Sequence, residues 1–137
     1  MKKTLKELQV GDQATYVKKI TEKDVGMFAE VSGDFNPVHL DETYASHTMF
    51  KTRIAHGGLV SSLFSTVLGT KLPGEGTIYM EQDSRFIRPV YLDDTITATV
   101  EVDEIDEIKG RVRLKTIATN QKGEPVVSGF ALVMPPR

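Results

Sequence analysis

Residues 59–69 restrict the possible folds of this chain more than any other segment. Folded as a helix, this segment carries apolar side chains around much of its circumference: Leu59, Val60, Leu63, Phe64, Val67 and Leu68. A helix with one apolar stripe lies on a surface, whereas a helix that is apolar on most sides is enclosed by other elements. The rest of the chain must therefore supply a surface that wraps around this helix.

The second half of the chain supplies that surface. Four segments have the residue pattern of β-strands, and turns that contain Asp, Asn and Gly separate them. The predicted strands span residues 77–86, 95–102, 111–119 and 126–134. Residues 14–20 predict a further strand. Because such an antiparallel sheet must bury one face, we predict an α+β fold in which the sheet wraps around the central helix.

Two shorter helices are predicted in the first half. Thr21-Glu22-Lys23-Asp24 resembles a capping box with Asp in place of Glu, and it opens a segment with apolar residues at helical spacing that ends at Gly33. Asp41 is placed to cap a second helix over residues 42–46. No linker, repeat or low-complexity tract divides the 137 residues, so we predict a single domain over residues 1–137.

Composition excludes several classes of function. The chain has a net charge of −2, whereas nucleic-acid-binding proteins are typically basic. The absence of cysteine excludes disulfides, thiolate nucleophiles and cysteine metal sites. Residues 1–7 carry charges where a signal peptide needs an apolar stretch, and no apolar run is long enough to cross a membrane. We expect a soluble, cytoplasmic protein that binds neither nucleic acid nor membranes.

The sequence Asp34-Phe35-Asn36-Pro37-Val38-His39 holds two groups that can move protons. Pro37 restricts its own backbone and that of Asn36, so residues 33–37 form an extended or turned loop rather than a helix. Asp34 and His39 then project from opposite ends of a stiff bend, which suits acid/base catalysis. Alternatively, Asp34 and Asn36 are only turn residues, and His39 is an ordinary core or surface histidine.

His56-Gly57-Gly58 stands directly before the predicted central helix. The first N–H groups of a helix have no partners inside the helix, and Gly57 has no Cβ to keep a ligand carbonyl away from them. This helix start can therefore hold a developing oxyanion. The alternative is that Gly57 and Gly58 only permit close packing or an unusual turn.

Taken together, Asp34-Phe35-Asn36-Pro37-Val38-His39 and the later His56-Gly57 resemble the hydratase signature of the MaoC-like (R)-specific enoyl-CoA hydratases. The similarity extends to residues 50–57, 63–65 and 72–79 and covers most of the chain. It implies the hot-dog fold, a catalytic pair formed by Asp34 and His39, and donation from the Gly57 amide to a thioester oxygen.

The resemblance also implies a reaction. Water adds reversibly to trans-2-enoyl-CoA to give (R)-3-hydroxyacyl-CoA, with coenzyme A as part of the substrate and no separate cofactor. It implies a homodimer with each site near the interface, and a connection with fatty acid metabolism and the supply of polyhydroxyalkanoate precursors. The residues leave open how Asp34 and His39 divide the proton transfers. Two other functions fit the fold: an acyl-CoA thioesterase, which would not need His39, and a non-catalytic acyl-CoA-binding module.

Further residues are predicted to bind substrate. The floor of an acyl pocket is expected from residues one or two turns past Gly57, so Ser65 and Leu68 are predicted to close it, with Val133 facing them. Such a pocket favours short chains of about four to six carbons. Basic residues are predicted to meet the phosphates of coenzyme A; they are Arg53, Lys51, Arg85 and Arg88. The alternatives are that Leu68 is plain core and that these cations are surface charges.

No metal site is predicted. His39, His47 and His56 have no recognisable metal-binding spacing. We expect His56 to hold the loop before Gly57 through a backbone hydrogen bond, and His47 to be exposed. No serine lies on a nucleophile elbow, and Gly57-Gly58 lacks the rest of a phosphate-binding loop.

Overall fold

The computed structural model describes residues 2–137, so Met1 of the predicted domain 1–137 lies outside the described part. The strands are β1 (Gln13–Lys19), β2 (Ile78–Phe86), β3 (Thr95–Asp106), β4 (Arg111–Thr119) and β5 (Pro125–Met134). The helices are η1 (Leu5–Glu7), α1 (Glu22–Ser32), α2 (Pro37–Leu40), α3 (Glu42–Ser46) and α4 (Gly57–Thr70).

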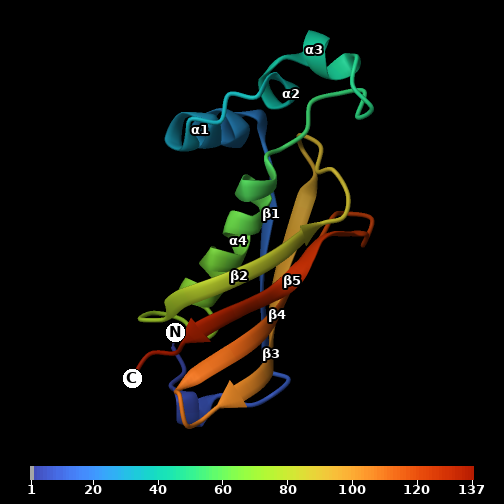
Figure 1. The fold of residues 1–137 in the computed structure, drawn as a ribbon. Helices are drawn as coiled ribbons and strands as arrows, with labels where there is room; N and C mark the ends of the chain where they lie inside the picture. The colour runs from blue at the N-terminus through green and yellow to red at the C-terminus, as the bar shows by residue number, and fades with distance from the viewer. Residues whose placement is uncertain (1) are drawn as a thin grey trace.

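The strands form one antiparallel sheet in the order β1-β3-β4-β5-β2, and α4 runs along one face of it (Figure 1). The segment that holds α1, α2 and α3 lies at one end of the sheet, close to the start of α4 (Figure 1). The C-terminus and η1 lie toward the opposite end (Figure 1). This arrangement confirms the predicted α+β fold with a sheet around a central helix.

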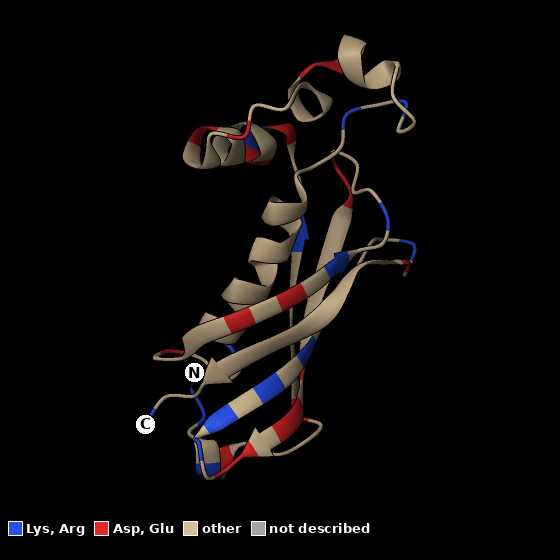
Figure 2. Cartoon of the chain, in the orientation of Figure 1, with Lys and Arg blue, Asp and Glu red and all other residues tan. Residues whose placement is uncertain are grey.

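Helix α4 forms the centre of the hydrophobic core. The apolar residues predicted to lie around the circumference of α4 are all buried. Every second residue along β4 and the first part of β3 is also buried, and the apolar side chains among these belong to the same hydrophobic cluster. Figure 2 shows α4 without a charged residue, in contrast to α1 and to strands β1, β2, β3 and β4. Because burying a charge without a partner is costly, an uncharged helix suits this enclosed place.

The predicted elements differ most from the structure at α2 and at the end of β3. The helix α2 was not predicted, although Asn36 caps it and Pro37 occupies its first turn, where a proline costs no hydrogen bond. The strand predicted over residues 95–102 continues to Asp106, past a register shift between Val102 and Glu104. Four-residue helices and bulged strands leave only weak periodic patterns in a sequence.

The predicted ends of α1 are confirmed. Thr21 and Asp24 bond each other reciprocally, with the Asp24 amide 3.1 Å from the Thr21 hydroxyl and the Thr21 amide 2.9 Å from the Asp24 carboxylate. Gly33 ends the helix with a φ of 80°, a conformation that favours glycine. The chain therefore turns sharply at Gly33 and enters the loop that carries Asp34.

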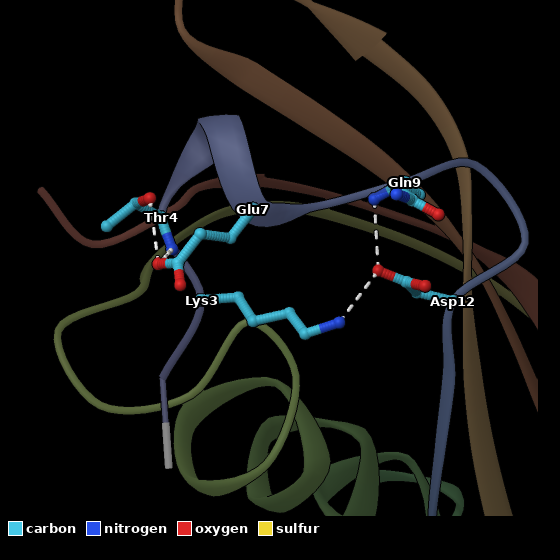
Figure 3. A network of polar contacts seen from close by, with 5 residues as sticks. All are labelled: Lys3, Thr4, Glu7, Gln9 and Asp12. Atoms are coloured by element: carbon cyan, nitrogen blue, oxygen red, sulfur yellow. Dashed lines mark hydrogen bonds and ion pairs between the residues drawn. The ribbon is translucent and has the colours of Figure 1, made fainter.

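The N-terminal segment is tied down by carboxylates (Figure 3). Asp12 accepts hydrogen bonds from the Gln9 amide at 3.0 Å and the Lys3 ammonium at 3.2 Å. Glu7 accepts from both the amide and the hydroxyl of Thr4, each at 3.0 Å. The Gln9 hydrogen bond, more than Lys3, holds the pKa of Asp12 below its ordinary value. Across residues 2–137, no helix has the length and apolar character needed to span a membrane.

Candidate functional site

The loop of residues 33–36, called the Asp34 loop below, is shaped by short local hydrogen bonds. The Asp34 carboxylate accepts from the Asn36 amide at 3.1 Å, and the Asn36 side chain accepts from the Val38 amide at 3.2 Å. These bonds confirm that Asp34 and Asn36 have turn roles, and they bend the chain into α2. The same bend brings His39, two residues into α2 from Pro37, back towards Asp34.

His39 is held in a defined tautomer. The residue is 8% exposed, and its Nδ1 lies 2.8 Å from the carbonyl oxygen of Ile54. A carbonyl oxygen can only accept, so Nδ1 carries the hydrogen and Nε2 carries a free lone pair when the ring is neutral. His39 therefore presents a proton acceptor on the side away from Ile54.

The environment of His39 favours its neutral form. Burial is the main cause that lowers the pKa of His39 below the ordinary value of 6.5, and the charge of a protonated His56 would lower it further. The hydrogen bond to Ile54 and the negative charge of Asp34 raise the pKa but do not outweigh burial. At neutral pH the ring is accordingly an acceptor.

His56 is buried between α1 and α2, where its ring contacts Phe28 and His39. The ring is 2% exposed and stacks on His39 with ring centroids 3.9 Å apart. Its Nε2–H donates to the Asp34 carbonyl oxygen at 3.0 Å. His56 therefore does make the expected backbone hydrogen bond, but to the Asp34 loop rather than within the segment before Gly57.

Gly57 begins α4, as predicted, and none of the described residues accepts a hydrogen bond from its amide. A Cβ at Gly57 would lie 2.8 Å from the ring of Phe86, so only glycine fits without moving that ring. The free amide and the missing side chain together leave the helix start open to a ligand oxygen. This geometry agrees with the predicted oxyanion role of Gly57, which stays a prediction.

His39 and Gly57 share a cleft of about 480 Å³. Its other walls are largely apolar and come from α4 and the segment before it, and from the end of β2 and the segment after it; they include Phe50, Ile54, Val60, Phe86 and Val90. Asp34 is exposed beside the cleft, and its carboxylate lies within 4.8 Å of ring nitrogens of His39 and His56. The structure thus brings together the three residues that were predicted to be catalytic.

Asp34, His39 and His56 are also close enough to be considered as metal ligands. The two imidazoles are stacked with ring planes only 30° apart, and ring-nitrogen lone pairs lie in those planes, so they do not converge on one ion. The nitrogens facing Ile54 and Asp34 are hydrogen-bond donors to carbonyls. The arrangement therefore fits proton transfer better than metal binding.

The predicted substrate-binding residues lie elsewhere. Leu68 and Val133 are fully buried in the core, Ser65 is exposed on α4, and none of them lines the cleft of the described chain. Arg53 is occupied by structural bonds, because its Nε donates to the His39 carbonyl at 2.7 Å and its Nη1 pairs with Glu22 at 2.8 Å. Their roles in binding substrate stay predictions.

The other basic residues are spread over different surfaces. Arg88 lines the cleft beside His39, and its guanidinium donates to the Pro125 carbonyl at 2.8 Å. Lys51 is exposed, and Arg85 points to a separate hollow on the sheet. Of these cations, Arg88 has the position best suited to a phosphate of a ligand in the cleft. His47, as expected, is exposed.

The sequence reasoning missed two residues at this site. Phe86 lies opposite Gly57 although it comes from the end of β2, and Ile54 fixes the tautomer of His39 through its backbone. Phe86 carries a signal that could have been used, since it is a large apolar residue at a strand end. Ile54 could not have been found, because any residue has a carbonyl group.

The acidity of His39 gives a testable pH dependence. Because its folded pKa is lowered, the active neutral form persists below pH 6.5, and kcat/KM should have an acid limb centred below that value. The unfolded chain binds the proton more readily, so stability is fully present above pH 6.5 and declines as the pH falls toward the folded pKa. A pH–rate profile checks this expectation. An acid limb centred at or above pH 6.5 would contradict it.

The fold and the site define a hot-dog protein with an acid/base pair beside the N-terminus of its central helix. The model of the MaoC like domain matches residues 8–124. The chain therefore belongs to the MaoC-like family, which confirms the resemblance and the predicted fold class.

Curated relatives of similar length support this assignment. The chain is 45% identical to the (R)-specific enoyl-CoA hydratase of Rhodospirillum rubrum, over 95% of this chain and 90% of the relative. It is 43% identical to the (R)-specific enoyl-CoA hydratase of Aeromonas caviae, over 94% of this chain and 96% of the relative. It is 44% identical to the 3-hydroxybutyryl-CoA dehydratase of Methylorubrum extorquens, over 96% of this chain and 83% of the relative.

Solved structures show the same relationship. The unliganded R-hydratase PhaJ1 from Pseudomonas aeruginosa superposes with a TM-score of 0.92 at 50% identity, covering 98% of this chain and 86% of the other. The (R)-hydratase from A. caviae involved in PHA biosynthesis has a TM-score of 0.92 at 43% identity, covering 94% of this chain and 98% of the other.

Proposed function

We propose that this protein is an (R)-specific enoyl-CoA hydratase, which adds water reversibly to trans-2-enoyl-CoA to give (R)-3-hydroxyacyl-CoA. The observation that carries the proposal is that His39 and Gly57 line one apolar cleft, with the Asp34 carboxylate within 4.8 Å of a His39 ring nitrogen. The named activities of relatives that match nearly the whole chain support it.

The tautomer of His39 favours one division of the proton transfers. Neutral His39 accepts a hydrogen bond from water at Nε2, which leaves the Asp34 carboxylate to take the proton as the water oxygen attacks C3. The electron pair of the C2–C3 double bond moves toward the thioester, and the Gly57 N–H stabilises the enolate oxygen. The protonated Asp34 then returns its proton to C2, so that one water has been added and the site is restored.

This mechanism uses only side chains, the backbone and water. We propose that the enzyme needs no metal and no cofactor apart from the coenzyme A of its substrate. Arg88 is the cation that we propose for a coenzyme A phosphate, while Leu68 and Val133 are kept as proposed limits of the acyl pocket. In the reverse direction, Asp34 removes the C2 proton and then protonates the leaving C3 hydroxyl, while His39 Nε2 accepts a hydrogen bond from that hydroxyl.

We further propose a homodimer in the cytoplasm. Strand β2 is one of the two edge strands of the sheet, and it exposes large apolar residues; these are Ile78, Tyr79, Met80 and Phe86. An exposed apolar edge strand is a surface that a second copy can extend. Phe86 also lines the cleft, so a partner at this edge would lie near the site, as the resemblance implies.

An assay with crotonyl-CoA separates this function from thioester hydrolysis. We expect the conjugated enoyl absorbance to decrease without release of free thiol. Thiol release without loss of the enoyl group would favour the thioesterase. Tight binding with neither reaction would favour an acyl-CoA-binding module.

A further inference from the structure

His56 has contacts that its position in the chain does not require. It is the N-cap residue of α4, yet its side chain makes no capping hydrogen bond. The imidazole instead points back to the Asp34 loop and donates to the Asp34 carbonyl. One face of the ring meets His39, and Phe28 of α1 lies 4.9 Å away between ring centroids.

The Asp34 loop has few other connections. The Asp34 amide donates to the Ser32 hydroxyl at 3.1 Å, and the remaining side-chain hydrogen bonds of the loop join residues two positions apart. Within residues 2–137, His56 makes the only hydrogen bond between this loop and a distant part of the chain. Local bonds fix the shape of a loop but not its place in the molecule, so the place of Asp34 depends on His56.

The second nitrogen of His56 points to the same conclusion. Nδ1 is buried and has no hydrogen-bond partner among the described residues. The ring therefore has one polar contact, the Nε2–H donated to Asp34, and protonation at Nδ1 would bury an unpaired donor. The hydrogen bond to Asp34 and the stacking on His39 are therefore the interactions that fix the orientation of the buried His56 ring.

We infer that His56 is a positioning residue, which holds Asp34 against His39 and joins both to the helix start at Gly57. It acts through Asp34 and does not itself exchange a proton with substrate. The inference rests on the proposed hydratase function and assigns a further residue to it. Because a misplacement of about 1 Å can cost roughly 10²-fold in rate, loss of this bond should mainly lower kcat.

Two substitutions separate the hydrogen bond from the stacking. His56→Phe keeps an aromatic ring between His39 and Phe28 but removes the donor. His56→Gln loses the ring but can place an amide N–H near the position of Nε2. We expect His56→Phe to lower kcat for crotonyl-CoA about 10²-fold with little change in KM, and His56→Gln to retain most of kcat.

Thermal unfolding and a control complete the kinetic test. His47→Gln changes an exposed histidine away from the cleft and should leave kcat unchanged. If kcat falls equally in His56→Phe and His56→Gln, in proportion to the loss of Tm, His56 is merely structural and the inference fails. Losses of more than about 10³-fold in both variants, with unchanged Tm, would make His56 a catalytic group and would also overturn it.

Hydrogen exchange tests the positioning without relying on turnover. In His56→Phe, the amides of Asn36 and Val38 should exchange at least about tenfold faster than in the wild type, while those of α4 stay protected. His56→Leu serves as a second donor-free variant if His56→Phe is not recovered folded. Unchanged exchange in the Asp34 loop would refute the inference even if wild-type hydration is confirmed. Absence of hydration in the wild type would refute the function but leave the exchange result valid.

Discussion

Asp34→Asn is expected to lower kcat for hydration of crotonyl-CoA by about 10²–10⁴-fold, which corresponds to about 3–5 kcal/mol of barrier. Asparagine cannot take the proton from water. Its side-chain oxygen can still accept the hydrogen bond from the Asn36 amide, so the loop keeps its shape. Because Asp34 is exposed, Tm should change little. Steady-state kinetics and thermal unfolding measure the two effects separately.

Asp93→Asn is the matched control for this substitution. Asp93 is exposed and has a φ of 74°, a conformation that asparagine also tolerates. Among the described residues, its side chain makes only an exposed ion pair with Lys19. The kcat of the Asp93→Asn variant should equal that of the wild type. If Asp34→Asn has near wild-type turnover, Asp34 is only a turn residue.

His39→Asn and His39→Gln are expected to lower kcat by a similar factor, about 10²–10⁴-fold. Asparagine can keep a donor near the position of Nδ1 for the Ile54 carbonyl, whereas it has no group near Nε2. Glutamine reaches the position of Nε2, but its amide oxygen is a far weaker acceptor than the imidazole lone pair. Both variants therefore lack the imidazole nitrogen that holds the water, although they differ in which hydrogen bond they keep.

The stability of the two variants separates structure from chemistry. His39→Gln leaves the Ile54 carbonyl without its donor and should unfold more easily than His39→Asn, by about 1–3 kcal/mol. A large loss of kcat in both, despite unequal stability, indicates a chemical role. If His39→Asn is fully active, His39 is a buried structural histidine. Thioester hydrolysis that survives in either variant would favour the thioesterase instead.

Much of this site could be predicted because its residues are close together in the sequence. Pro37 predicts the bend between Asp34 and His39, and Gly57 predicts where the central helix begins. The enclosed character of α4 could be predicted from its apolar residues, which is why the fold class was correct. Each of these sequence patterns lies within a few neighbouring residues or repeats along a single helix or strand.

The remaining features depend on contacts between distant residues. The bond from His56 to Asp34 spans 22 positions, and Phe86 meets Gly57 from another element. Arg53 was predicted to bind phosphate because it is a cation, and this role stays a prediction. In the structure its guanidinium bonds the His39 carbonyl and the Glu22 carboxylate. A charge in the sequence does not show which partner it will find.

The stereochemistry of hydration tests the central claim most directly. Asp34 and His39 approach the bound enoyl group from one side, so water should reach only one face of C3. The product of crotonyl-CoA hydration, analysed by chiral chromatography after hydrolysis of the thioester, should be the (R)-3-hydroxy acid. A product that is mainly (S), or racemic from the first turnovers, would contradict the proposed function.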